Sequence, residues 1–119
     1  MGDEPKTILV VDGEQDPTQS LARMLGEEGY SVLQARNGAE AMDTLKNASK
    51  LPDLVIMDLL MSTMDAWKFR HLQKQDAKFR SIPVIGVTST GATANVDADL
   101  ILHRPVDVEF LLRAIQHFC

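Results

Sequence analysis

The sequence has little of several residue types that mark other classes of protein. Cysteine occurs once in 119 residues, at Cys119, which excludes an internal disulfide framework and a cysteine metal site. No apolar run approaches the roughly 20 residues that cross a bilayer. The first residues, Met-Gly-Asp-Glu-Pro-Lys, lack the basic and apolar segments of a signal peptide. We therefore expect no membrane association and, by default, a cytoplasmic location.

Basic residues are also in the minority. The chain has 12 Lys and Arg against 17 Asp and Glu, which gives a formal net charge of -5. Binding to nucleic acid depends on basic side chains that neutralise phosphates, and we identify no basic stripe or basic amphipathic helix in the sequence. We therefore expect no direct binding of nucleic acid. The expected partners are proteins, cations and phosphoryl donors.

What is present is typical of one globular domain. The apolar fraction of 45% and the charged fraction of 24% are ordinary, and the length suffices for a single core. Five short apolar runs predict strands: Thr7–Val11, Ser31–Ala35, Leu54–Met57, Ile82–Thr88 and Leu100–His103. Several runs are continuously apolar and β-branched rather than alternating, which is typical of strands covered on both faces.

Helical periodicity lies between these runs. Residues at helical spacing fall into four sets: Leu21, Met24, Leu25 and Glu28; Ala41, Met42, Leu45 and Ala48, in a helix from about Gly38; Trp67, Phe69 and Leu72; and Leu111, Ala114, Ile115 and Phe118. We expect Asp16 to cap the first helix ahead of Pro17. Asp65 is the expected cap of the third helix, with Trp67 packed at the start of that helix.

Strands that alternate with helices predict an α/β fold. The expected architecture is a doubly wound, five-stranded parallel sheet with right-handed crossovers and helices on both faces. One crossover is short, because only 11 residues, Ser89 to Asp99, join the fourth strand to the fifth. These residues are mostly poor helix formers. We expect a shortened or irregular fourth helix there.

Polar side chains stand at the ends of four predicted strands. Asp12 follows the first strand, Asp58 the third and Arg104 the fifth, while Thr88 ends the fourth. In an open parallel sheet, ligands bind beyond the carboxyl ends of the strands. Crowded carboxylates favour a hard cation such as Mg²⁺, and an aspartate can attack phosphorus as a nucleophile. A fixed cation and a hydroxyl would then bind the transferred phosphoryl group.

The segments around these residues resemble the receiver domains of two-component response regulators, over essentially the whole chain. Residues 8–14, Ile-Leu-Val-Val-Asp-Gly-Glu, resemble the first strand and acidic corner of that family. Residues 52–66, Pro-Asp-Leu-Val-Ile-Met-Asp-Leu-Leu-Met-Ser-Thr-Met-Asp-Ala, resemble its phosphoacceptor strand and loop. Residues 82–88, Ile-Pro-Val-Ile-Gly-Val-Thr, resemble its fourth strand, and Arg104-Pro105 falls where the family has Lys-Pro.

The resemblance implies a flavodoxin-like (βα)5 fold and a role for each strand-end residue. Asp58 would accept a phosphoryl group from a histidine kinase or phosphotransfer protein. Asp12, Asp58 and the backbone carbonyl of Leu60 would hold Mg²⁺. Thr88, as the switch residue, and Arg104 would bind the phosphoryl group. The domain would be a signalling module with at most slow self-dephosphorylation, rather than an enzyme. The family also implies a cis Arg104-Pro105 bond.

The sequence departs from the family at the site. Gly13 stands where a second acidic ligand is usual, and Glu14 is a candidate substitute for it. A unit charge pair at 4 Å is worth roughly 4 kcal/mol at an effective dielectric near 20, so we expect weak Mg²⁺ binding and slower phosphorylation. Arg104 keeps the charge of the family lysine, but its charged group is a planar guanidinium instead of a compact ammonium. It could also pair permanently with Asp58 or Asp12 and imitate the activated state.

Two alternatives stay open at this point. In the first, the chain is a pseudo-receiver, a protein-interaction module that signals without phosphate. Gly13, Arg104, the short crossover and an aliphatic Ile101 in place of the family's switch aromatic all favour it. In the second, the chain is a doubly wound domain that binds a cofactor, although no Gly-rich phosphate loop follows the first strand. We expect residues 1–119 to form one receiver domain, either on its own or cut from a larger protein that carries an output domain.

Overall fold

A computed structural model describes residues 5–12, 21–58, 63–88 and 98–119 of the chain, and only the backbone of residues 63–66. Five parallel strands form one sheet in the order β2-β1-β3-β4-β5. The strands are β1 (Thr7–Val11), β2 (Ser31–Ala35), β3 (Leu54–Asp58), β4 (Val84–Thr88) and β5 (Leu100–His103). The helices are α1 (Leu21–Glu27), α2 (Gly38–Asn47), α3 (Thr63–Gln75) and α4 (Val108–Phe118).

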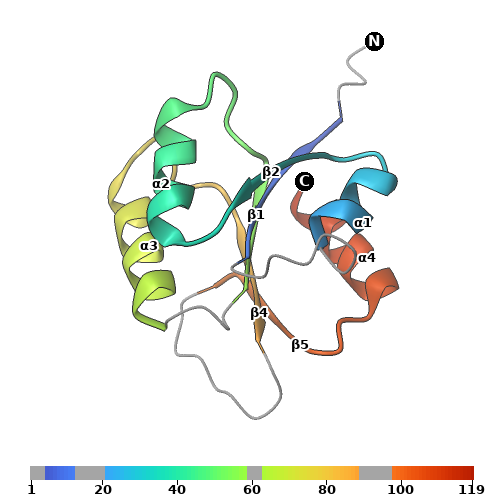
Figure 1. Ribbon diagram of the computed structural model, residues 1–119. Helices are drawn as coiled ribbons and strands as arrows, with labels where there is room; N and C mark the ends of the chain where they lie inside the picture. The colour runs from blue at the N-terminus through green and yellow to red at the C-terminus, as the bar shows by residue number, and fades with distance from the viewer. Residues whose placement is uncertain (1–4, 13–20, 59–62, 89–97) are drawn as a thin grey trace.

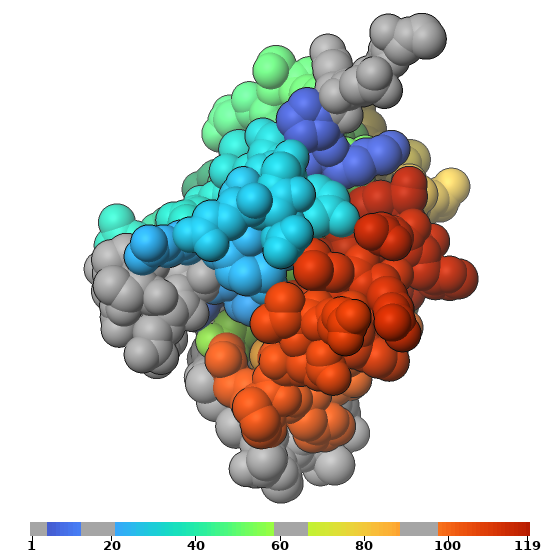
Figure 2. All heavy atoms as spheres, turned by 90° about the vertical axis from the view of Figure 1, so that its right-hand side faces the viewer, coloured from blue at the N-terminus to red at the C-terminus, as the bar shows by residue number. Residues whose placement is uncertain are grey.

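The helices cover both faces of the sheet, as predicted. In Figure 1, α2 and α3 lie on one side of the strands and α1 and α4 on the other. Figure 2 shows the side of α1 and α4, where these two helices lie next to each other over the sheet. Among the described helices, which have 7 to 13 residues, none is long and apolar enough to cross a bilayer.

The predicted strands are confirmed with two changes at their ends. β3 includes Asp58, and β4 begins at Val84 instead of Ile82. Pro83 has no N–H for a ladder hydrogen bond. The carbonyl of Ile82 accepts a hydrogen bond from the side chain of Gln73 in α3, at 2.8 Å, so it leaves the strand ladder.

The continuous apolar runs form strands that are buried on both faces. In β1, Ile8 and Val10 pack into the cluster under α1 and α4, while Leu9 and Val11 pack into the cluster under α2 and α3. All five residues of β1, β3 and β4 are buried, whereas the edge strands β2 and β5 are more exposed. The central position of β1, β3 and β4 explains why these segments lack polar alternation.

The positions of the helices were predicted more accurately than the residues at their ends. Asn37 caps α2, and its side chain accepts a hydrogen bond from the Glu40 N–H at 2.8 Å. The prediction that Asp65 caps α3 is wrong, because α3 already begins at Thr63. Glu28 lies beyond the end of α1 and is exposed, so it is not part of the packed face. Asp16 and Pro17 lie outside the described residues, and so does residue range 89–97 of the short crossover.

Trp67 does not pack at the start of α3, contrary to our prediction. The helix has already made its first turn at this residue, and the Trp67 side chain is 55% exposed. Phe69 and Gln73, at 1% and 0% exposure, occupy the positions of α3 that face the sheet. The three apolar residues of the predicted stripe therefore lie on different sides of the helix.

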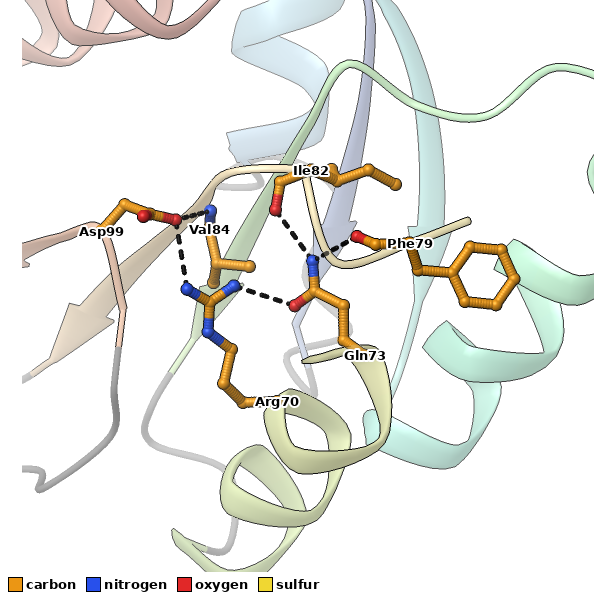
Figure 3. A network of polar contacts seen from close by, with 6 residues as sticks. All are labelled: Arg70, Gln73, Phe79, Ile82, Val84 and Asp99. Atoms are coloured by element: carbon orange, nitrogen blue, oxygen red, sulfur yellow. Dashed lines mark hydrogen bonds and ion pairs between the residues drawn. The ribbon is translucent and has the colours of Figure 1, made fainter. Parts of the chain in front are cut away.

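A polar network, buried at Arg70 and Gln73 and more exposed at Asp99, ties α3 to the amino ends of β4 and β5 (Figure 3). The Nη1 atom of Arg70 donates to Gln73 Oε1 at 2.9 Å, and its Nη2 atom lies 3.3 Å from Asp99 Oδ2. The same Asp99 oxygen accepts the backbone N–H of Val84 at 2.8 Å. Gln73 Nε2 donates to the carbonyls of Phe79 and Ile82 at 3.0 and 2.8 Å. This network holds Asp99, which directly precedes β5, against α3.

We predict that Gln73→Leu destabilises the fold by about 2–4 kcal/mol. The buried Ile82 carbonyl loses this donor and Arg70 Nη1 loses this acceptor, at about 1–3 kcal/mol each, while the Phe79 carbonyl still accepts the Ile82 N–H at 3.0 Å. Urea denaturation followed by circular dichroism measures the change. Gln75→Leu is the matched control, because Gln75 is exposed in the same helix and should change the free energy of unfolding by less than about 0.5 kcal/mol. Equal effects of the two substitutions would contradict a structural role of the network.

Candidate functional site

The sheet register brings the four predicted strand-end residues to one rim. Val11 pairs with Met57, so Asp12 and Asp58 stand at the ends of adjacent strands. Asp58 pairs with Val87 of β4, which is followed by Thr88. Thr88 in turn pairs with His103 of β5, the residue before Arg104. The predicted arrangement of four polar residues along the carboxyl rim is therefore present in the structure.

An ion pair joins two of these residues. The Nη2 atom of Arg104 lies 2.9 Å from Oδ2 of Asp58, and the Asp58 side chain is only 4% exposed. Arg104 itself is 36% exposed, so its guanidinium spans from the solvent to the buried carboxylate. Removal of one charge from a buried pair leaves the other uncompensated and is costly. Arg104 therefore places a positive charge directly beside the buried Asp58 carboxylate in this state.

Backbone contacts fix the two ends of this rim. The N–H of Arg104 donates to the carbonyl of Thr88 at 2.9 Å, which continues the β4–β5 pairing by one residue. The Arg104-Pro105 bond is cis, as the resemblance implied. At the other end, the N–H of Asp12 donates to the carbonyl of Ala35 at 2.9 Å. This role of Ala35 could not be predicted from the sequence, because a backbone acceptor has no residue signature.

One donor of Arg104 is unused. Its Nε atom is buried and, within the described part of the chain, has no hydrogen-bond partner. A buried unpaired donor costs about 1–3 kcal/mol. The guanidinium therefore has a donor available at the rim while another of its nitrogens contacts Asp58. An additional acceptor oxygen next to Asp58 would relieve this cost.

The carboxylates of the rim suit a magnesium ion with several water ligands. Asp58 is buried and Asp12 is half-buried, at the ends of adjacent strands. Among the described residues, no group of three or more His, Cys, Asp or Glu side chains could hold a metal. Mg²⁺ needs no such group, because it is usually bound through one or two carboxylates and keeps its waters. The candidate ligand Leu60 and the neighbouring Gly13 and Glu14 lie outside the described residues.

Comparison with known proteins decides the family. The family described as the response regulator receiver domain matches residues 8–116. The chain belongs to this family. Receiver domains are signalling domains and not an enzyme family, and the match does not favour the pseudo-receiver or the cofactor-binding alternative.

Several relatives carry the same domain within longer proteins. The response regulator Rre1 of Synechocystis sp. is 34% identical over 91% of this chain and 49% of its own length. The sensor histidine kinase CheAY of Helicobacter pylori is 33% identical over 69% of this chain and 10% of its own length. This receiver domain thus spans about half of Rre1 and a tenth of CheAY.

Solved structures agree with the observed fold. The crystal structure of the signal receiver domain of a signal transduction histidine kinase from Syntrophus aciditrophicus is similar with a TM-score of 0.80. The two chains are 30% identical, and the match covers 95% of this chain and 89% of the other. The flavodoxin-like receiver fold predicted from the sequence is therefore confirmed.

We predict that Arg104→Met destabilises the receiver domain by about 1–3 kcal/mol, because the buried Asp58 charge loses the Arg104 guanidinium. Denaturation in the presence of a chelator measures the change without added metal. Arg113→Met is the matched control: Arg113 pairs with Glu109 at 3.9 Å on an exposed surface, and its loss should cost less than about 0.5 kcal/mol. If Asp58→Asn does not reduce the cost of Arg104→Met, the ion pair is not its cause.

Proposed function

We propose that Asp58 is the phosphoacceptor of this receiver domain and that the domain signals through the phosphorylated state. The observation that carries the proposal is a carboxylate of 4% exposure at the carboxyl end of the central strand β3, held at 2.9 Å by a guanidinium. A phosphoacceptor needs an ionised oxygen that can attack phosphorus. It also needs fixed positive charge for the oxygens of the incoming group.

Arg104 is the proposed anchor of the phosphoryl group. In the observed state its Nη2 contacts Asp58 Oδ2, and its buried Nε lacks a partner. A phosphoryl group on Asp58 adds acceptor oxygens beside this guanidinium. An arginine can bind such oxygens through two parallel N–H bonds, which a lysine cannot do. The replacement of the family lysine by Arg104 is therefore compatible with phosphorylation.

Asp12, Asp58 and the backbone carbonyl of Leu60 are the proposed ligands of Mg²⁺. The ion would neutralise charge on the phosphoryl group. We propose that its binding is weak, because Gly13 supplies no carboxylate where the family has one. Glu14 is the candidate substitute. The charge of Arg104 beside Asp58 also competes with a cation for that carboxylate, which weakens binding further.

Thr88 is the proposed switch residue. It is 1% exposed at the end of β4, next to the strand of Asp58, and its carbonyl accepts the N–H of Arg104. A phosphoryl group would bias a pre-existing equilibrium between two arrangements of this rim. Any self-dephosphorylation of the domain would be slow.

The wider setting follows from the relatives and is also a proposal. Receiver domains act with histidine kinases and output domains, and two relatives carry the domain in longer proteins. We propose a histidine kinase or phosphotransfer protein as the phosphoryl donor, an output domain or partner protein as the target, and a cytoplasmic location. We propose that this domain does not itself bind nucleic acid.

We predict that incubation with Mg²⁺ and acetyl phosphate adds the mass of one phosphoryl group, measured on the intact chain. Asp58→Asn should abolish the adduct, because an amide is not a nucleophile of this kind. Asp43→Asn is the control, because Asp43 is exposed on α2, and it should leave the adduct unchanged. An unphosphorylated wild-type domain that is folded, or an adduct that survives in Asp58→Asn, would refute the proposal.

We predict that Gly13→Asp lowers the Mg²⁺ concentration for half-maximal phosphorylation by roughly tenfold to a hundredfold. An added carboxylate is worth up to roughly 4 kcal/mol at 4 Å and an effective dielectric near 20, and solvent returns part of it. Gly13→Asn keeps a similar side-chain size without charge and should change the half-maximal concentration little. An unchanged Mg²⁺ requirement in Gly13→Asp would show that the missing acid does not limit binding.

A further inference from the structure

Positive charge is concentrated in one segment of an acidic chain. Residues 68–80 contain five of the 12 Lys and Arg residues and a single acidic residue, Asp76. The rest of the chain has seven basic and 16 acidic residues. The segment comprises the last two turns of α3 and the turn that leads to β4. Our expectation that the sequence has no basic stripe is therefore wrong.

Most of these side chains reach the solvent on the outer side of α3. Only Arg70 is buried, where it belongs to the network with Gln73 and Asp99. We define the α3 outer face by the following exposed residues of the helix and the turn after it: Trp67, Lys68, His71, Lys74, Lys78 and Arg80. In Figure 1, α3 lies at the outside of the fold, with its other side toward the sheet.

Helical spacing places an aromatic ring among these charges. Trp67, His71 and Lys74 stand at positions i, i+4 and i+7, and therefore on one stripe, with Lys68 beside it. Trp67 is 55% exposed, while the core positions of the helix are filled by Phe69 and Gln73. The fold thus gains little from the Trp67 ring. An exposed aromatic ring with polar residues around it is typical of a protein interface, in which Trp and Arg contribute much of the binding energy.

We propose that the α3 outer face binds an acidic segment of a partner protein, one that carries an apolar side chain for contact with Trp67. Charge complementarity favours an acidic partner, since the charged side chains that the structure describes on this face are basic. A short acidic segment interacts mainly with the basic side chains nearest to it and little with the negative net charge of the chain. Charges beyond roughly 8–10 Å are screened in physiological salt. A long polyphosphate such as DNA would also meet the acidic remainder of the chain, which repels it.

This surface is separate from the phosphoacceptor proposal. None of its residues contributes to the contacts of Asp58, Arg104 or Thr88 described above, and binding of the partner segment does not require a phosphoryl group. The two proposals can therefore fail independently. The variant Asp58→Asn should bind an acidic segment as well as the wild-type chain does.

Trp67 supplies the signal for the test, because it is the single tryptophan of the chain. The probes are a synthetic peptide of alternating Glu and Leu and its counterpart with Gln in place of Glu. We expect the acidic peptide to shift Trp67 emission saturably, and the neutral peptide to bind at least about tenfold more weakly. Anisotropy of the labelled acidic peptide measures binding to Trp67→Gln, which should also be weakened at least about fivefold.

Matched charge reversals separate the α3 outer face from the net charge of the chain. Lys68→Glu/Lys78→Glu should weaken binding of the acidic peptide at least about tenfold. Lys46→Glu/Arg113→Glu changes the net charge equally at exposed positions of α2 and α4 and should stay within about twofold of wild type. Circular dichroism of each variant checks that it is folded.

Three results would overturn the proposal. The acidic peptide does not shift Trp67 emission; or the two double variants lose affinity equally, so that binding follows net charge alone; or a DNA duplex or phosphatidylglycerol vesicles bind more tightly than the peptide through the same face. In the last case the α3 outer face recognises phosphate and not a protein segment.

Discussion

The sheet of this receiver domain is parallel and buried on both faces, and the rest of the structure depends on that constraint. Ile8 and Val10 need one helical layer and Leu9 and Val11 need the other, so helices must cover both faces of the sheet. Each crossover returns a strand in the same direction. The carboxyl ends of β1, β3, β4 and β5 consequently share one rim, and the polar residues that follow them meet there.

The two rims of the sheet carry different polar interactions. At the carboxyl rim, Arg104 pairs with the buried Asp58, and its buried Nε has no hydrogen-bond partner among the described residues, so this rim can accept further ligands. At the amino rim, Arg70, Gln73 and Asp99 use their donors and acceptors on one another and on the backbone. The amino-rim network fixes where β5 begins. The carboxyl rim is therefore the part that the proposed phosphoryl group would change.

Besides the candidate site at the carboxyl rim, this chain has a separate basic surface on α3. The side of α3 that faces the sheet serves the fold through Phe69, Gln73 and Arg70, and the outer side shows no comparable packing role for Trp67. A signalling domain needs at least one surface for partners in addition to its modified residue. The α3 outer face follows β3 in the chain and lies away from the sheet, which makes it suitable for that role.

The sequence by itself determined the strand pattern, the parallel fold and the four rim residues Asp12, Asp58, Thr88 and Arg104, because continuous apolar runs and strand-end positions are local features of the chain. Only the tertiary structure decided that Arg104 pairs with Asp58 and that Asp99 bonds to Arg70, since these partners are 46 and 29 residues apart and no local pattern encodes their meeting. It also decided which side of α3 is buried. Trp67 was predicted to pack and is exposed, because an aromatic residue in a helix shows no direction until the sheet and Phe69 define the core side.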